Sequence, residues 1–269
     1  MASTRDGIVT DEEQQPLLRQ HSPPGRTVLS RLGRSMHAEV DRSWADLVLL
    51  LCYFVTGLLD SSSTQVWGAF VSMQTGNSVY VGLGLASLAH PPASSRLWRS
   101  GVSLVSFCAG SFIFARFHRH FSPKRRWVLC ASFAAQALLT TAAASVVGRT
   151  SPAQDPDSTA WNVLLPIGLV AFQSCAQAVT SRALRYNALT SVVLTSIYCD
   201  LFSDKDLLAP VNAERNRRAA APVLLIGGAV VGGLLAHSAV GIGGALWLAA
   251  LLKLLMVVLW IFWPAEKEE

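Results

Sequence analysis

Eight long apolar segments constrain the fold of this chain more than any other feature of its sequence. A run of about 20 apolar residues can cross the hydrocarbon core of a bilayer as a helix. The chain of 269 residues is 51% hydrophobic and only 14% charged, which is typical of a membrane protein. We therefore expect an all-α polytopic membrane protein whose first partner is the lipid bilayer. The segments lie at 44–63, 68–89, 98–117, 127–147, 161–180, 187–203, 219–240 and 245–263.

Polar flanks on either side of the apolar region set the expected domain limits. Residues 1–41 are rich in proline, glutamine, serine and arginine and lack apolar periodicity, which predicts a disordered cytosolic tail. Residues 42–264 would form a single transmembrane domain, and 265–269 a short C-terminal tail. Because no apolar core follows a basic start in the tail, we expect no cleaved secretory signal.

The string EQQPLL in the tail resembles an acidic dileucine sorting signal. Glu13 stands four residues before the pair Leu17 and Leu18, an arrangement that clathrin adaptors read on cytosolic tails. Such a short pattern also arises by chance, and the alternative is a solvated tail with two isolated leucines. An adaptor bound here would favour an endosomal or vacuolar membrane over the plasma membrane.

Two of the apolar segments carry polar interruptions. The segment 68–89 contains MQTGN, and the segment 187–203 contains ALTSVVLTS. A polar break in a membrane helix is tolerated where it is buried in protein or faces water. The alternative is an ordinary span whose Thr and Asn side chains form hydrogen bonds across helices.

The distribution of basic residues favours interrupted segments over full spans at 68–89 and 187–203. If all eight segments crossed from a cytosolic N-terminus, the loop RFHRHFSPKRR at 116–126 would lie outside, against the positive-inside rule. If 68–89 and 187–203 each enter and leave on one side, this loop lies inside. We expect about six spans plus two interrupted or re-entrant segments, with seven or eight full spans as the alternative. Halves at about 44–147 and 161–263, with three spans each, would then form an inverted repeat.

The interrupted segments also carry a family resemblance. The strings GLLDSSSTQVWGAFVSMQTGNSVYVGLG and FQSCAQAVTSRALRYNALTSVVLTSIYCDLF resemble the YoaK-type family of uncharacterised multi-spanning membrane proteins. The resemblance covers about residues 45 to 262. Ser174 and Ser196 depart from the family pattern, in which Asn and Gly are expected. The resemblance implies a multi-spanning fold and no established activity.

Polar residues in and beside the interruptions are the candidates for a substrate or ion pathway. Asp60 precedes the hydroxyl-rich run SSSTQ and is a candidate titratable group, because transporters use carboxylates to hold protons or cations. The alternative is an interfacial carboxylate beside a hydrated turn. The other candidate positions are Thr75, Gly76, Asn77, Gln173, Thr190 and Thr195.

Lys253 is the most anomalous side chain, because it lies about seven residues, or roughly 10 Å, from the nearer end of the last apolar segment. A central lysine costs about 2.5–3.5 kcal/mol on insertion scales. We expect it to pair with Asp60 or Asp200, or to line an aqueous cavity. The alternative is a tilted helix whose lysine reaches the interface by snorkelling.

Small residues in the apolar segments have structural explanations. Gly228 and Gly232 stand at GxxxG spacing, which lets two helices approach closely. The five cysteines lie in apolar stretches without CxxC spacing, and we expect them to be small membrane-buried side chains.

Motifs of known enzymes are missing from the sequence. It contains no GxxxxGK[ST], HExxH or GxSxG string, and its six histidines are scattered, so we expect no enzyme, no cofactor and no metal site. The formal net charge of +5 arises from short loops rather than one solvated face, so we expect no nucleic-acid partner. We expect a transporter of a small solute or ion, with proton coupling as an option. The alternative is a non-transporting membrane scaffold or chaperone.

Overall fold

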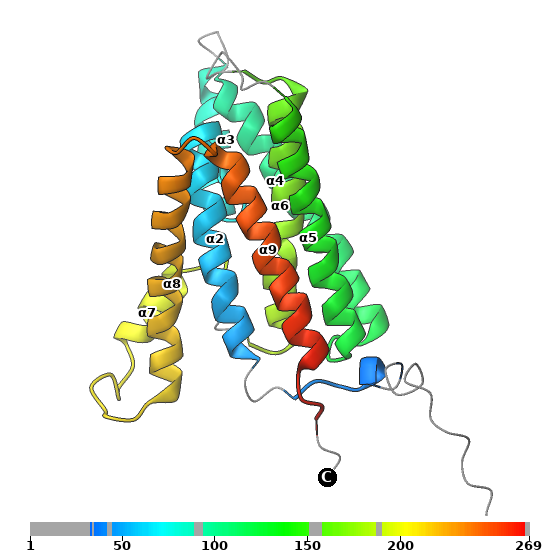
Figure 1. The fold of residues 1–269 in the computed structure, drawn as a ribbon. Coiled ribbons are helices and arrows are strands. Elements are labelled where there is room, and N and C mark those ends of the chain that lie inside the picture. Colours follow the sequence, from blue (N-terminus) through cyan, green and yellow to red (C-terminus); the bar gives the residue numbers. More distant parts are fainter. Residues whose placement is uncertain are drawn as a thin grey trace, which may run out of the picture.

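A computed structural model describes residues 33, 35–41, 45–88, 94–150, 158–186 and 190–266. The named elements of these residues are all α-helices (Figure 1). They are α2 (Asp46–Trp67), α3 (Gln74–Ser87), α4 (Ser95–Phe121), α5 (Arg126–Arg149), α6 (Trp161–Ala183), α7 (Thr195–Phe202), α8 (Ala213–Ala236) and α9 (Gly241–Phe262).

Six of the described helices are long and apolar enough to cross a membrane: α2, α4, α5, α6, α8 and α9. The other two are shorter. At 1.5 Å per residue, the 14 residues of α3 rise about 21 Å and the 8 residues of α7 about 12 Å, against a hydrocarbon thickness of about 30 Å. The predicted all-α fold is thereby confirmed, with six candidate membrane-spanning helices. Among the described residues of 68–89 and 187–203, neither α3 nor α7 is long enough to cross by itself.

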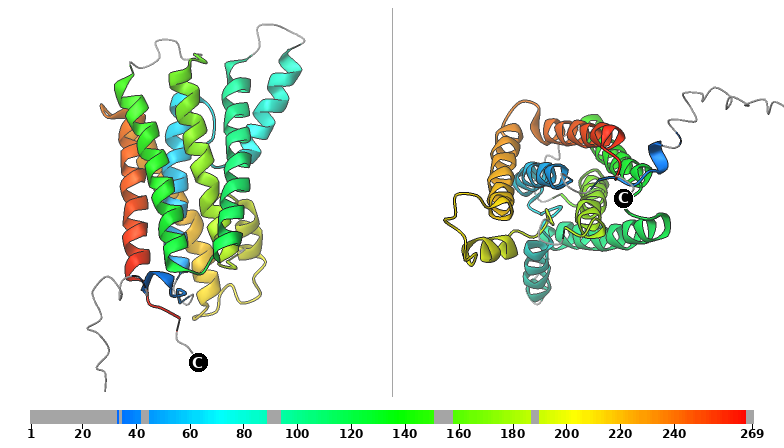
Figure 2. Two further views of the ribbon diagram at one scale, coloured as in Figure 1. Left: turned by 90° about the vertical axis from the view of Figure 1, so that its right-hand side faces the viewer. Right: turned by 90° about the horizontal axis from the view of Figure 1, so that it is seen from below.

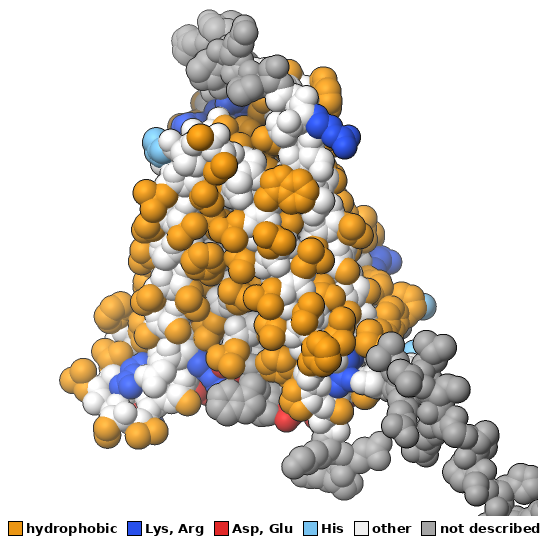
Figure 3. All heavy atoms as spheres, viewed as in Figure 1, with side chains coloured by type: hydrophobic (Ala, Val, Ile, Leu, Met, Phe, Trp, Pro, Cys, Tyr) orange, Lys and Arg blue, Asp and Glu red, His pale blue; other side chains and the backbone are white. Residues whose placement is uncertain are grey.

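The six long helices form one bundle, in which helices distant in sequence pack side by side (Figures 1 and 2). The main packed pairs are α2 with α8, α4 with α6, and α5 with α9. The span in α2 is the most buried of the six. Hydrophobic side chains cover the side of the bundle seen in Figure 3, as expected for a surface that contacts lipid. Exposed examples are Val105, Phe112, Leu234, Leu251 and Phe262.

Glycines allow two of these pairs to approach closely. A Cβ atom built on Gly228 of α8 would lie 2.0 Å from the carbonyl oxygen of Phe54 in α2. A Cβ atom built on Gly110 of α4 would lie 2.2 Å from the carbonyl oxygen of Phe172 in α6. Both distances are far below van der Waals contact, so only glycine fits at either position. Gly232 also packs against α2, and the predicted packing role of the GxxxG pair is confirmed.

Residues 35–41 form a strap across the end of the bundle where α5 begins and α9 ends (Figure 1). The Val40 N–H donates to the Lys124 carbonyl at 3.0 Å, and the Glu266 N–H donates to the Glu39 carbonyl at 2.9 Å. The Lys124 ammonium pairs with Glu266 at 3.0 Å and with Glu39 at 3.4 Å, and its hydrogen bond to Glu266 raises the pKa of Lys124. The packed part of the chain therefore starts before the expected limit at residue 42, and the described ends lie on one side of the bundle.

Candidate functional site

The first interruption is a tight non-helical turn between α2 and α3. Gly68 ends α2 with a left-handed φ of 68°, and its N–H donates to the Thr64 carbonyl at 3.1 Å. This conformation favours glycine and lets the chain turn back toward α2. Residues 68–73, with Gly68 as the first, lie outside the helices before α3 starts.

Asp60 holds this turn in place. Its carboxylate accepts the backbone N–H groups of Val71 and Ser72 at 2.8 Å each and that of Met73 at 3.1 Å. The side chain is buried, with 4% exposure. In the span of a membrane protein these N–H groups have no water to bind, so a carboxylate that accepts all three is strongly stabilising. The predicted pathway residue Asp60 thus has a clear structural task.

Asn77 binds the same turn from the other side. Its side-chain carbonyl accepts the Phe70 N–H at 3.0 Å, and its amide donates to the Phe70 carbonyl at 2.7 Å. The amide also lies 3.0 Å from the Ser103 hydroxyl of α4. Gly76 packs under Phe70, because a Cβ there would lie 2.6 Å from the phenyl ring. Thr75 is exposed, so the predicted trio at 75–77 divides between the turn and the surface.

Lys253 is fully buried, with 0% exposure, and its ammonium donates to the side-chain carbonyl of Gln136 at 2.7 Å. Within the described residues, no carboxylate lies at ion-pair distance from it. Asp60 binds the turn instead. The expected pairing with Asp60 or Asp200 is therefore wrong, and so is the snorkelling alternative, because a neutral amide of α5 solvates this ammonium inside the bundle.

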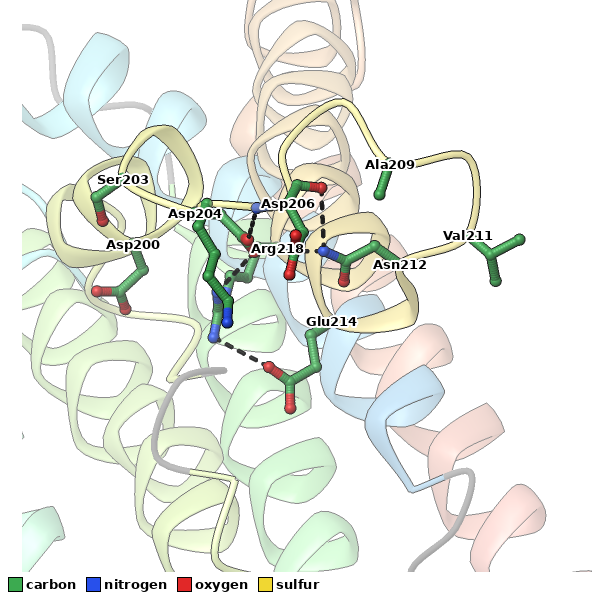
Figure 4. Close-up of a pocket in the computed structure, with 10 residues that line it drawn as sticks. Asp200, Ser203, Asp204, Asp206, Ala209, Val211, Asn212, Glu214 and Arg218 are labelled. Atoms are coloured by element: carbon green, nitrogen blue, oxygen red, sulfur yellow. Dashed lines mark hydrogen bonds and ion pairs between the residues drawn. The ribbon is translucent and has the colours of Figure 1, made fainter.

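Asp200 lines a surface pocket of 620 Å³ beside α7 and the start of α8 (Figure 4). Asp204 organises the pocket by accepting from the Asp206 N–H at 2.9 Å and from Arg218 at 3.3 Å. Arg218 also contacts Glu214 at 3.3 Å. These bonds tie the loop after α7 to α8.

A chain of buried polar groups continues from Lys253 toward the strap side of the bundle. The Gln136 amide lies 3.5 Å from the Ser132 hydroxyl, and that hydroxyl lies 3.4 Å from Nε2 of His118. The Thr180 hydroxyl lies 3.4 Å from the same nitrogen. The five side chains come from α9, α5, α4 and α6, and each has at most 2% exposure. We call Lys253, Gln136, Ser132, His118 and Thr180 the polar chain.

Sequence reasoning found only Lys253 among these residues. Gln136 and Thr180 stand inside long apolar segments, which was an available signal, because a polar side chain in hydrocarbon requires a partner. The six histidines are scattered along the sequence, and nothing in the linear pattern indicates that His118 contacts Ser132 and Thr180.

The remaining predicted residues do not join the polar chain through any described hydrogen bond. Gln173 is fully buried and its amide donates to Ser174 at 3.1 Å. Thr190 is buried at the start of the segment before α7, whereas Thr195 is exposed. Gln177, one helical turn after Gln173, reaches the Thr56 hydroxyl of α2 at 3.4 Å.

The two remaining predictions concern a metal site and the sorting signal in the tail. In the part of the chain that the structure describes, no group of three His, Cys, Asp or Glu side chains could hold a metal ion. Glu13, Leu17 and Leu18 lie outside the described residues, and the adaptor signal stays a prediction.

Comparison with known proteins identifies the family. No curated protein and no solved structure matches the chain significantly. A family model described as "Protein of unknown function (DUF1275)" matches residues 48–259, a range that contains four of the candidate spans, nearly all of the first and the last, and both interruptions. The chain therefore belongs to the DUF1275 family, the YoaK-like family of uncharacterised membrane proteins that its interrupted segments resemble.

Proposed function

We propose that this protein is a transporter of a small solute or ion, with alternating access around the segments of α3 and α7. The polar chain is the observation that carries the proposal. Lys253 is the thirteenth of the 22 residues of α9, and Gln136 is the eleventh of the 24 residues of α5. Their contact therefore lies near the middle of two spans, where an ammonium is expensive and usually serves a solute or proton pathway.

The pairing of helices supports an inverted repeat of the kind that transporters use. An inverted repeat would match α2 with α6, α3 with α7, α4 with α8 and α5 with α9. Under this matching the α2·α8 pair corresponds to the α6·α4 pair, and the α5·α9 pair corresponds to itself. All three pairs are packed in the structure. Gly110 and Gly228 are 118 residues apart, and so are Phe54 and Phe172, whose carbonyls they contact. Each half thus presents a glycine to the same position in the other half, as a twofold relation requires.

The two short helices support re-entrant segments at equivalent places. Each follows the first span of its half, and each contacts the next span, α3 with α4 and α7 with α8. In transporters, such broken helices lie at the repeat interface, and their movement opens the pathway to one side or the other.

Basic residues support a cytosolic position for the strap side of the bundle. This end carries the loops between α4 and α5, between α6 and α7, and between α7 and α8 (Figure 1). Its Lys and Arg residues include Arg119, Lys124, Arg125, Arg126, Arg182, Arg185, Lys205, Arg215, Arg217 and Arg218.

The polar chain also contains the residues that would carry a coupled proton. Asp60 accepts three N–H bonds within the turn, so we assign it to holding the interruption rather than to carrying the proton. Lys253 and His118 are the two members of the chain whose charge changes on protonation, and proton coupling would use them. We propose binding and movement of a solute, without a covalent step.

Solute flux into vesicles tests this proposal. Purified protein is reconstituted into liposomes, and stopped-flow light scattering follows re-swelling with glycerol, glycine, chloride and benzenesulfonate. At least one solute should enter faster than in empty liposomes. Lys253→Met should abolish the gain, while Lys205→Met, at an exposed position after α7, should keep it. If well-folded wild-type protein moves no solute faster than empty liposomes, the scaffold or chaperone alternative is the better description.

A further inference from the structure

A second pocket, of 450 Å³, lies between the strap-side halves of α4 and α6. Its wall is mostly apolar and includes Phe107, Ala115, Ala178, Val179 and Val192. Three basic side chains complete it: His118, Arg119 and Arg182. A volume of 300–1,000 Å³ is typical of sites that hold small molecules.

The charge of this pocket has one sign. Arg119 and Arg182 are exposed, and no Asp or Glu is among the described residues that line the pocket. A guanidinium presents a fork of N–H donors that matches a carboxylate. The pocket therefore combines an apolar wall with two cations that suit an anionic group.

His118 marks the inner side of the pocket. Its ring has 2% exposure, and among the described residues its Nδ1 atom is buried without a hydrogen-bond partner. An unsatisfied buried polar atom is costly unless a ligand or water reaches it. His118 also lines the pocket, so its imidazole lies beside the space that a bound anion would occupy.

We propose that this pocket binds a small organic monoanion, a carboxylate on an apolar body, and that this is the chemical class of the transported solute. The anionic group contacts Arg119 and Arg182, and the apolar body packs on Phe107 and Val179. The assignment of this ligand as the transported solute rests on the proposed transport function, whereas the binding site does not.

The polar chain provides the onward route. His118 belongs both to the pocket wall and to the chain that leads through Ser132 and Gln136 to Lys253. An anion that leaves the two arginines can meet the imidazole and then the buried ammonium, so each step offers a donor or positive charge. This sequence of groups lowers the cost of moving an anion into a low-dielectric interior.

Binding to the full-length protein in detergent tests the site without requiring transport. Isothermal titration should give saturable binding of benzoate and much weaker binding of benzamide, which has the same shape without the charge. Arg182→Gln and Arg119→Gln should each weaken benzoate binding about tenfold, the effect of losing one charge-assisted hydrogen bond. Arg149→Gln, at an exposed position on the opposite end of α5, is the matched control and should bind as wild type. Ala178→Phe, which fills the pocket, should abolish binding while the protein still elutes as a single species.

Three results would overturn the proposal. These are no saturable benzoate binding, equal binding of benzamide, or equal weakening by Arg149→Gln. Oleate distinguishes a membrane fatty acid from a soluble anion: saturable oleate binding without benzoate binding would assign the pocket to a lipid and also refute the proposal. Benzoate binding without solute flux would refute transport alone, whereas flux without benzoate binding would refute this pocket alone.

Discussion

At the residue scale, two buried charges of this protein are solvated by neutral groups of its own chain. Lys253 is bound by the Gln136 amide at 2.7 Å, and Asp60 by three backbone N–H groups. Both residues are conspicuous in the sequence as charges inside apolar segments, and an ion pair between them was a natural expectation. Amides satisfy each charge separately, so the two can serve different tasks.

The Lys253–Gln136 contact predicts a compensating pair of substitutions. Lys253→Met should leave the Gln136 carbonyl buried without a donor and lower stability by about 1–3 kcal/mol. Lys253→Met with Gln136→Leu should recover most of this loss, because two apolar groups then face each other. Thermal unfolding of the purified proteins measures both effects. Recovery by Asp60→Asn instead of Gln136→Leu would contradict the contact.

Asp60 predicts a substitution that is severe despite its small size. Asp60→Asn removes the charge and places an amide N–H₂ where Oδ2 accepts the Met73 N–H, so that bond is lost and the bonds from Val71 and Ser72 then end on a neutral acceptor. We expect a loss of about 3 kcal/mol, since each bond to a charged group contributes about 1.5–3 kcal/mol. Asp200→Asn, at an exposed position, serves as the control and should unfold at the wild-type temperature. If the two variants unfold at the same temperature, Asp60 does not hold the turn between α2 and α3.

At the scale of elements, the bundle depends on close approach between helices that are distant in sequence. Gly228 meets Phe54, and Gly110 meets Phe172, at distances that exclude any side chain. Lipid tails are as apolar as the helices, so close packing rather than the hydrophobic effect drives helix association in a membrane. Glycine at these two positions is therefore a requirement of the α2·α8 and α4·α6 pairs.

Alanine substitution tests both contacts against controls in the same helices. Gly228→Ala and Gly110→Ala should each destabilise by about 1–3 kcal/mol, the usual cost of overpacking. Gly227→Ala and Gly101→Ala have nothing within 4 Å of the new Cβ atom and should be neutral or slightly stabilising. Thermal unfolding and size-exclusion profiles give the comparison. A similar loss in all four variants would point to helix propensity rather than to the interfaces.

At the scale of the whole molecule, the strap brings the described chain ends to one side of the bundle. An even number of crossings follows from that arrangement, in agreement with six spans. Tags at the two termini should therefore become protease-sensitive on the same face of sealed vesicles. Sensitivity on opposite faces would be incompatible with six crossings.

The sequence alone determined the class of the protein and most of its helix limits. Apolar runs of about 20 residues identified eight candidate segments, six of which contain the long helices, because span length follows from bilayer thickness. The breaks at 68–89 and 187–203 were visible as polar residues in apolar context. The positions of the basic loops favoured a topology in which each interrupted segment enters and leaves the membrane on the same side. Segment length, polar breaks and loop charge depend on neighbouring residues or on simple sums, so they can be read from the sequence alone.

Only the tertiary structure decided which polar groups meet. Gln136, Ser132, His118 and Thr180 come from three helices, and their contacts with each other and with Lys253 depend on how α4, α5, α6 and α9 pack. The same holds for Asp60, whose partners are backbone groups that no residue type reveals. A buried charge in the sequence indicates that a partner exists, since solvation is required in hydrocarbon. Which partner it is depends on three-dimensional packing, because a neutral amide or a turn of backbone satisfies the requirement as well as an opposite charge.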